Sequence, residues 1–227
     1  MSRTASYDES MYTQTLFRAL LDGMARPGKV QSMEAPTIPS PYANDRFLIG
    51  ILLTLLDQEV TLAMDAAGTE TSQFVQLYTL ARRAGWESCD FAVIDGASPV
   101  DLTLLKRGTF TFPDESATVI CRAGAVSDRL EGARSLTAQG GADFAQGQAD
   151  QPGAGGSINQ SLLKLNLAGP GIKDSRTLYL YGIKEQFITQ LQVCNMEFPL
   201  GIDLILYDGD GRLCCIPRTT QIRLEGK

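Results

Sequence analysis

The sequence predicts an α/β fold, in which helices cover both faces of a mixed β-sheet to give a layered α/β/α sandwich. Two observations support this prediction. Segments with helical periodicity alternate with short β-prone segments over the first 122 residues, which is typical of strands connected by helices. Several β-prone segments are apolar at consecutive positions, as in strands buried on both faces. We find neither a repeat nor an interior linker, so we expect one domain over residues 1–227.

The first predicted helix covers residues 11–24, where apolar side chains recur every three or four positions. Pro27-Gly28 is expected to end it, because proline cannot continue a helix and glycine suits the backbone at a helix C-terminus. Arg26 lies at the last turn, where a cation interacts favourably with the helix dipole. The side chains expected on the apolar face are Leu16, Phe17, Leu20, Leu21 and Met24.

Two further helices are predicted before residue 90. Asn44 or Asp45 is expected to cap an apolar, buried helix that runs to Leu56, after an extended connector over 31–42 that contains three prolines. Ser72 is expected to cap the next helix, which stops at Gly85. The side chains expected to face inward from this helix are Phe74, Leu77, Tyr78 and Ala81.

The strands of the first half are predicted from alternating or continuous apolar runs. The remaining elements expected there are strands over 59–65 and 89–95, a short helix over 99–106, a short strand over 108–112 and a strand over 117–122.

Residues 123–160 interrupt this alternation. Gly140–Ser157 is rich in Gly, Ala and Gln, and we expect it to form a flexible surface loop. Its glycine run lacks the lysine that a Walker phosphate-binding loop requires, so the sequence does not predict a nucleotide site there. The elements expected beyond it are strands over 162–167 and 177–181, and a helix over 184–196 that buries Phe187, Ile188, Leu191 and Cys194.

The C-terminal part contains the strongest local signal, a predicted β-hairpin. The runs 198–207 and 212–220 flank the Gly/Asp turn 208–211. The first run is too apolar for a strand with one solvated face, so it should lie in the middle of the sheet. Pro217 has no amide hydrogen for a neighbouring strand, so the second run should end there or lie at an edge.

The composition excludes several classes of function. A net charge of −6 disfavours non-specific binding to nucleic acid. The longest mostly apolar stretch, 47–56, is too short to cross a bilayer, and the N-terminus has no apolar signal core, so we expect a cytoplasmic protein. The chain has no histidine, which excludes Ser-His-Asp and Cys-His catalysis and histidine-ligated metals.

The cysteines and lysines give weak signals for chemistry. None of the five cysteines forms a Cys-x-x-Cys pair, and we expect buried thiols with no metal. Lys164 is the one lysine within an apolar run, and Ser161 and Lys164 have the Ser-x-x-Lys spacing of some nucleophilic serines. That spacing places both side chains on one face only in a helix, whereas a strand is expected here. We therefore expect Lys164 to lie exposed or at a strand edge.

Four segments, in this order, resemble a known family. They are Phe-Arg-Ala-Leu-Leu-Asp-Gly-Met-Ala-Arg-Pro-Gly-Lys-Val at 17–30, Gly-Pro-Gly-Ile at 169–172, Phe-Pro-Leu-Gly-Ile-Asp-Leu-Ile-Leu at 198–206 and Ile-Pro-Arg-Thr-Thr at 216–220. Together they are similar to the PhnH family, whose members belong to the core complex of the bacterial carbon–phosphorus lyase. Residues 85–160 contribute no motif to the resemblance.

The resemblance implies a fold like that of pyridoxal-phosphate transferases, without the cofactor site, and a non-catalytic accessory subunit. In that system, the PhnH protein and subunits G, I and L are associated with transferring a phosphonate to the ribose C1′ of ATP with release of adenine. A separate iron–sulfur protein, PhnJ, then cleaves the carbon–phosphorus bond. The partners implied are subunits G, I and J, with a homodimer for the isolated chain and no cofactor. The alternatives left open are a stand-alone pyridoxal-phosphate-type transferase and a small-molecule binding domain.

Arg218 is the charged residue with the widest choice of roles. Its guanidinium is suited to a phosphonate, a triphosphate or a partner's carboxylate, and equally to an internal partner such as Asp203. Asp203 lies within an apolar strand and needs a partner if it is buried. We expect structural or interface roles rather than catalytic ones for this region. The residues concerned are Gly169, Pro170, Gly171, Asp203, Pro217, Arg218 and Thr219.

Overall fold

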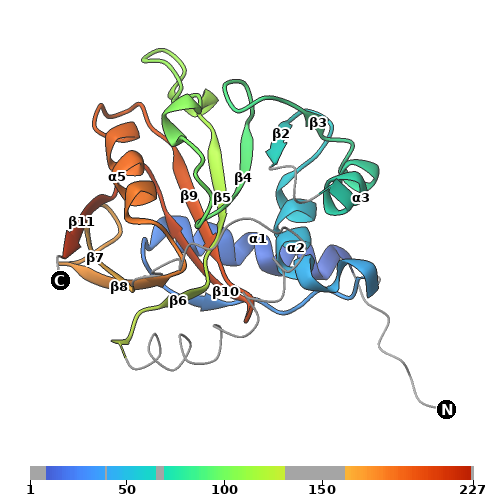
Figure 1. The fold of residues 1–227 in the computed structure, drawn as a ribbon, viewed down its shortest axis with the longest axis horizontal. Helices are drawn as coiled ribbons and strands as arrows, with labels where there is room; N and C mark the ends of the chain where they lie inside the picture. Colours follow the sequence, from blue (N-terminus) through green and yellow to red (C-terminus); the bar gives the residue numbers. More distant parts are fainter. Residues whose placement is uncertain (1–8, 39, 65–68, 131–161, 226–227) are drawn as a thin grey trace, which may run out of the picture.

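The computed structural model describes residues 9–38, 40–64, 69–130 and 162–225. Its centre is a mixed seven-stranded sheet, which Figure 1 shows running through the molecule between two covering layers. The five strands β3, β2, β4, β5 and β9 are parallel neighbours, and β10 and β1 extend the sheet in antiparallel fashion. In spatial order the strands are β1 (Gln31–Ser32), β10 (Arg212–Ile216), β9 (Asp203–Tyr207), β5 (Thr118–Arg122), β4 (Phe91–Asp95), β2 (Thr61–Met64) and β3 (Arg82–Arg83).

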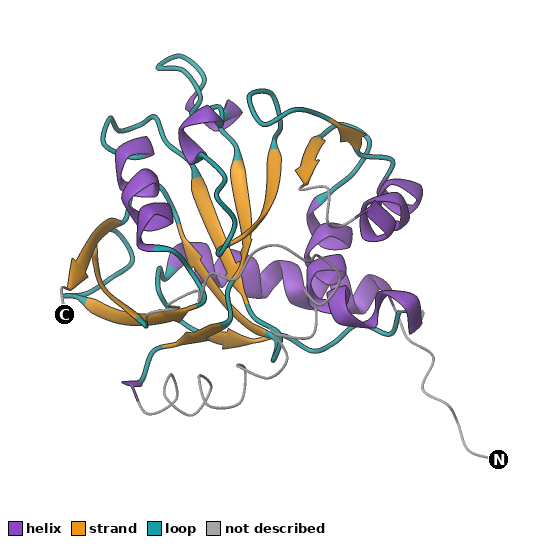
Figure 2. Cartoon of the chain, in the orientation of Figure 1, coloured by secondary structure: helices purple, strands orange, loops and turns teal. Residues whose placement is uncertain are grey.

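Helices cover one face of this sheet (Figure 2). Alternate side chains of the central strands, such as Ile120 and Ile205, pack against Leu16, Ile49 and Leu52 of the helices. Their intervening neighbours face the other side, as alternation along a strand requires. The elements on the helical face are α1 (Glu9–Ala25), the 3₁₀ helix η1 (Ser40–Asp45), α2 (Arg46–Leu55) and α3 (Thr69–Thr79).

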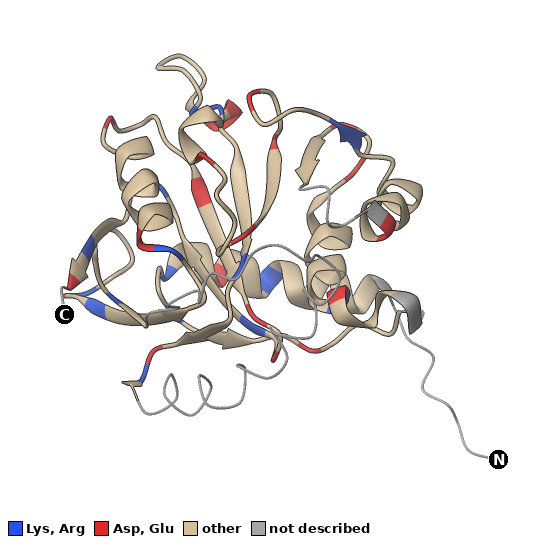
Figure 3. Cartoon of the chain, viewed as in Figure 1, with Lys and Arg blue, Asp and Glu red and all other residues tan. Residues whose placement is uncertain are grey.

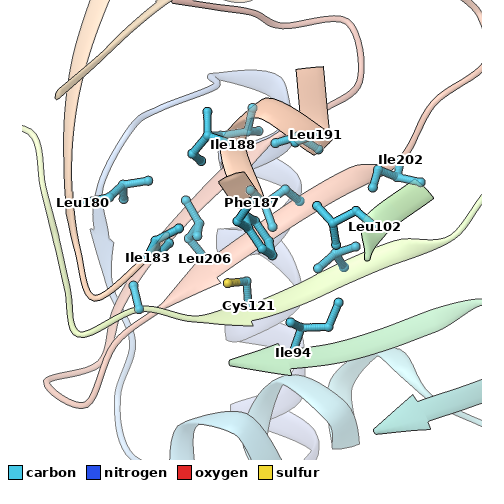
Figure 4. Close-up of a cluster of buried hydrophobic side chains, with 14 of the residues drawn as sticks. Ile94, Leu102, Cys121, Leu180, Ile183, Phe187, Ile188, Leu191, Ile202 and Leu206 are labelled. Carbon is cyan, nitrogen blue, oxygen red and sulfur yellow. The ribbon is translucent and has the colours of Figure 1, made fainter. Parts of the chain in front are cut away.

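The opposite face carries a helix and a second sheet together. Figure 4 shows Phe187, Ile188 and Leu191 of α5 (Glu185–Cys194) over Cys121 and Leu206 of the central strands. The second sheet is antiparallel, with strands in the order β11 (Gln221–Glu225), β7 (Leu163–Ala168), β8 (Arg176–Tyr181) and β6 (Ala125–Ser127). Two short 3₁₀ helices, η3 (Leu102–Leu104) and η4 (Pro113–Glu115), complete the described elements.

The predicted α/β class with a mixed sheet is confirmed, and its third layer differs from the prediction. The strands over 162–167 and 177–181 are present, but they belong to the second sheet and not to the central one. Two strands of that sheet, β6 and β11, were not predicted. β6 has only three residues, and β11 alternates a buried Ile222 with exposed polar neighbours beyond Pro217. The predicted loop over 140–157 lies outside the described residues.

The longer predicted helices are present, but α3 ends at Thr79 and not at Gly85, with the strand β3 in between. The apolar faces predicted for α1 and α3 also include side chains that are exposed. Leu16 and Leu20 of α1 are buried, while Phe17 is 46% and Leu21 54% exposed. In α3, Leu77 and Tyr78 are exposed although they were expected to face inward. Each helix lies on the surface of the sheet or of α2, so only a narrow apolar stripe is covered.

The caps and short elements also differ from the prediction. Asp45 precedes α2, but its carboxylate accepts a hydrogen bond from the Thr71 hydroxyl (2.5 Å) instead of capping the helix. Ser72 lies inside α3 and is not its cap. Residues 108–112 form no strand, and only one bridge, Arg107 to Ser116, joins that loop. The short helix over 99–106 is reduced to η3.

The hairpin follows the prediction closely. β9 lies in the middle of the sheet between β5 and β10, and β10 ends at Ile216, directly before Pro217. In the turn, the buried Asp208 carboxylate accepts backbone hydrogen bonds from Asp210 (3.0 Å) and Arg212 (2.9 Å). It also accepts one from Val126 of β6 (3.1 Å), so this carboxylate joins the hairpin to the second sheet.

Candidate functional site

The residues singled out in the sequence meet at one end of the molecule. The Gly-Pro-Gly-Ile segment is a tight turn between β7 and β8, closed by the Ile172 amide donating to the Gly169 carbonyl (3.1 Å). Gly171 has φ +80°, and a Cβ there would collide with the Ala25 carbonyl at the end of α1. Only glycine therefore lets the turn approach α1 this closely.

Arg176 of β8 also joins this turn to the end of α1, and the sequence analysis did not identify it. Its Nη1 donates to the backbone carbonyls of Arg26 (3.1 Å) and Pro27 (2.7 Å). Those carbonyls belong to the end of α1, where carbonyl groups lack helical partners. Gly28 in turn donates its amide to the Cys215 carbonyl of β10 (3.0 Å). The N-terminal and central motifs are thus joined to the hairpin.

The Ile-Pro-Arg-Thr-Thr segment turns the chain from β10 into β11. The Thr220 amide donates to the Pro217 carbonyl (2.9 Å), which closes a four-residue turn. Gly169, with φ +132°, packs closely against this turn. A Cβ at this position would lie only 3.0 Å from the Thr219 carbonyl oxygen. Pro170 is exposed beside it. The structure therefore brings Gly169, Pro217 and Thr219 together.

Arg218 is paired with Asp203, the first residue of β9. Its Nε donates to Asp203 Oδ1 (3.2 Å) and its Nη2 to Oδ2 (2.5 Å), a planar fork on one carboxylate. The Arg218 amide donates to the same Oδ1 (2.8 Å), and Nη1 donates to the Pro113 carbonyl (2.5 Å). Both side chains are mostly buried, at 15% and 20% exposed. Three side-chain nitrogens of Arg218 are therefore already bound within the chain.

Asn195 positions the chain that leads into Asp203. Its side-chain amide accepts from the Ile202 amide (2.8 Å) and donates to the Ile202 carbonyl (3.1 Å), as a neighbouring strand would. Gly201 lies between the side chains of Asn195 and Arg218. A Cβ on Gly201 would come within 2.5 Å of Asn195 Oδ1 and 3.0 Å of Arg218 Cβ. The end of α5, the start of β9 and Arg218 are therefore closely packed.

A groove of about 630 Å³ opens beside this packed region. It lies between the end of α5 and residues 218–223, with Pro170 at its margin. Gln192 of α5 lines it and donates to the Ile222 carbonyl of β11 (2.8 Å). Figure 3 shows basic residues on β11 and on the neighbouring strands of its sheet. Three of the candidate residues, Pro170, Arg218 and Thr219, line the groove.

Comparison with known proteins agrees with the motifs gathered at this end of the molecule. Residues 5–223 match the family model described as bacterial phosphonate metabolism protein (PhnH). The chain belongs to the PhnH family.

Two curated relatives align over nearly all of the chain. One is the putative C-P lyase subunit protein HtxG of Stutzerimonas stutzeri, 28% identical over 94% of this chain and 87% of the relative. The other is the alpha-D-ribose 1-methylphosphonate 5-triphosphate synthase subunit PhnH of Rhizobium meliloti (strain 1021), 26% identical over 96% and 94%. Both alignments span nearly the whole length of each protein, which agrees with the family match.

The carboxyl ends of the parallel strands are where open α/β sheets usually bind ligands. In this PhnH-family chain, Tyr207 lies there beside Arg122, which is 4.0 Å from Asp45. Burial, with Asp45 and Asp95 nearby, raises the pKa of Tyr207 above its usual value, so its phenol stays protonated near neutral pH. Sequence reasoning missed this cluster. The signal available was a polar residue, Asp95, Arg122 or Asp208, at the end of each apolar strand.

Among the described residues of this family member, the cysteines and Lys164 are not activated as nucleophiles. All five cysteines are buried, and burial raises the pKa of Cys89 to about 11 and of Cys214 to about 12, so both stay thiols at neutral pH. Lys164 is 43% exposed, as expected, and pairs with Glu225 (2.5 Å), but its strand β7 lies between β11 and β8 and is not an edge strand. Ser161 lies outside the described residues.

Two general features of the described residues bear on metals and membranes. Within ranges 9–38, 40–64, 69–130 and 162–225, no three His, Cys, Asp or Glu residues lie close enough to hold a metal ion together. None of the helices in those ranges is both long and apolar enough to cross a membrane.

Proposed function

We propose that this chain is a subunit of a carbon–phosphorus lyase complex, and that it contributes to assembly without an active site of its own. Membership of the PhnH family supports a role in phosphonate metabolism. Both relatives have names that describe them as subunits, one of a C-P lyase and one of a ribosyl-phosphonate triphosphate synthase.

One observation carries the assembly role: the polar groups of the motif segments bind one another. Arg218 donates two hydrogen bonds to the Asp203 carboxylate, and Arg176 donates to the carbonyls at the end of α1. A catalytic arginine would instead keep donors aimed at an open position where charge develops. The candidate residues Gly169, Pro170, Gly171, Asp203, Pro217, Arg218 and Thr219 therefore hold the hairpin, the second sheet and α1 in place for contact with partners.

The proposal also covers the reaction of the complex and the partners of this chain. The complex would transfer a phosphonate to the ribose C1′ of ATP and release adenine, in agreement with the triphosphate synthase name of the Rhizobium relative. The partners would be subunits G, I and J in the cytoplasm, and the isolated chain would form a homodimer. The fold would be related to pyridoxal-phosphate transferases without their cofactor. In support, none of the lysines in the described ranges is buried, and a Schiff-base lysine requires a desolvated pocket.

The test is co-expression of the affinity-tagged chain with subunits G, I and J, followed by an assay, with subunit L added, of methylphosphonate-dependent adenine release from ATP. We expect the tagged chain to recover the other subunits in fixed ratio. We also expect adenine release to need the complete set and to be absent with the chain alone. Adenine release by the chain alone, or failure to recover any subunit, would refute the proposal.

A further inference from the structure

The groove between the end of α5 and residues 218–223 has an apolar rim that no other part of the described chain covers. Met196 is 79% and Phe198 68% exposed, and both line the groove. Val193, on the last turn of α5, is 47% exposed. Three large apolar side chains exposed within six residues of one another form a patch that is typical of protein contact sites.

The charge of the groove has one sign. Its two charged lining residues are Arg218 and Arg223, and no Asp or Glu from the described ranges lines it. The whole chain, by contrast, carries a net charge of −6. Arg218 is occupied by Asp203, while Arg223 is exposed on β11. A binding partner that places a carboxylate near Arg223 would therefore complement the local charge.

A buried hydroxyl in the groove lacks a partner. Thr220 is only 6% exposed, and its Oγ1 has no hydrogen-bond partner among the described residues. Buried polar side-chain atoms in folded proteins nearly always have a partner. Thr220 lines the groove, and its backbone is fixed by the turn that its amide closes with the Pro217 carbonyl. Because this oxygen is itself buried, an occupant of the groove could hydrogen-bond to it only if the Thr220 side chain turned toward the groove.

We infer that the groove binds an extended segment of a partner subunit, with an apolar side chain on Met196 and Phe198 and an acidic residue at Arg223. This inference rests on the proposed function, since the partner is taken to be another subunit of the same complex. A free phosphonate or nucleotide phosphate would use Arg223 but would gain nothing from the apolar rim. The rim therefore favours a polypeptide over a small anion.

The first experiment compares variants of the groove with matched variants elsewhere on the surface. Met196→Asp and Arg223→Glu alter the groove, while Leu77→Asp on α3 and Arg83→Glu on β3 make the same changes at exposed positions far from the groove in the fold. Each tagged variant is co-expressed with subunits G, I and J. We expect the groove variants to bind the purified partner subunits about tenfold more weakly, with unchanged melting temperatures, and the controls to bind like wild type.

The second experiment identifies what occupies the groove. Because all five native cysteines are buried, Met196→Cys would provide a thiol that reacts selectively with a photo-activated cross-linker. We expect cross-links from the assembled complex to lie in a partner-subunit segment that contains an acidic residue beside an apolar one.

The outcomes separate the two proposals. If the wild-type chain recovers no partner subunit, the proposed function fails. If wild type assembles and the groove variants assemble equally well, only the groove inference is overturned. Cross-links to a second copy of this chain would also overturn it. So would titrations in which Arg223→Glu abolishes binding of methylphosphonate or inorganic phosphate while assembly is unchanged.

Discussion

Replacing Arg218 by alanine tests whether the fork on Asp203 stabilises the junction of β9, β10 and β11. The change removes three side-chain hydrogen bonds, two to the Asp203 carboxylate and one to the Pro113 carbonyl. Breaking a buried ion pair by removing one partner costs about 3–5 kcal/mol. Here the side chains are 15% and 20% exposed, and Asp203 keeps the hydrogen bond from the Arg218 amide. We therefore expect a loss of about 2–4 kcal/mol in the free energy of unfolding.

The assay is urea denaturation of the wild type, Arg218→Ala, Arg218→Lys and Arg223→Ala. Arg218→Lys should recover only part of the loss, because an ammonium group cannot reproduce the planar fork. Arg223→Ala is the matched control, since Arg223 is exposed at the same groove, and a change within about 0.5 kcal/mol is expected. A loss for Arg218→Ala no larger than that of the control would refute the stabilising role.

The same variants separate a structural role from a catalytic one. If Arg218→Ala weakens both stability and recovery of partner subunits, adenine release should fall in proportion to the complex recovered. If stability and assembly stay at wild-type values while adenine release disappears, Arg218 acts on the substrate, and the accessory role of this site is wrong.

Three further predictions follow from individual contacts. Asp208→Asn should destabilise by about 1–3 kcal/mol in thermal denaturation, because an amide nitrogen would replace an oxygen that accepts two hydrogen bonds; stability equal to wild type would contradict this. Gly171→Ala should lower the free energy of unfolding by about 1–2 kcal/mol or more, because alanine disfavours the positive φ and its Cβ would collide with the Ala25 carbonyl. Gly209→Ala, where a Cβ would have no neighbour within 4 Å, should be near neutral. Equal effects of the two substitutions would rule out the close approach of Gly171 to α1. For Asp90, burial opposes ionisation, but hydrogen bonds from Lys106 and Thr61 hold its pKa below 3.8. Its stabilisation is therefore complete above pH 3.8 and is lost as the pH falls below it, so the deficit of Asp90→Asn in urea denaturation should shrink there; a deficit independent of pH would contradict this.

The central sheet was predictable because its strands are locally distinctive. The run from Asp203 to Tyr207 is buried at four of its five positions, and such a pattern has few alternatives to a central strand. The helix α5 was equally clear, and all four residues expected to be buried are buried. In both cases the pattern of one segment is enough to determine which face is covered.

The second sheet was not predictable from local patterns. β7 and β8 alternate buried and partly exposed residues, which indicates strands but not which sheet they join. β6 is recognised as a strand only through its pairing with β8 and the Asp208 contact to Val126, both with residues more than fifty positions away. Tertiary pairing overrides weak local propensity in such short strands.

In the candidate site, too, some contacts were predictable from the sequence and others were not. Arg218 and Asp203 were identified as possible partners because an acid in an apolar strand needs one, and the structure places them in contact. Arg176 and Asn195 were missed, since the side chain of each hydrogen-bonds to backbone groups outside its own strand or helix. A polar residue of this kind has no spacing signature in one sequence.

The position of β10 and β11 along the chain has a consequence for biosynthesis. β10 links the two-residue β1 to the central sheet, and β11 pairs with β7 along the second sheet (Figure 1). Both strands come from residues 212–225, so the ribosome must make the preceding 211 residues before either sheet has all its members. Until then, β9 and β7 each present an unpaired edge, and exposed edges pair readily with other chains. We therefore expect the partly synthesised chain to be more prone to mispairing at these edges than a fold whose sheets close from the N-terminus onward.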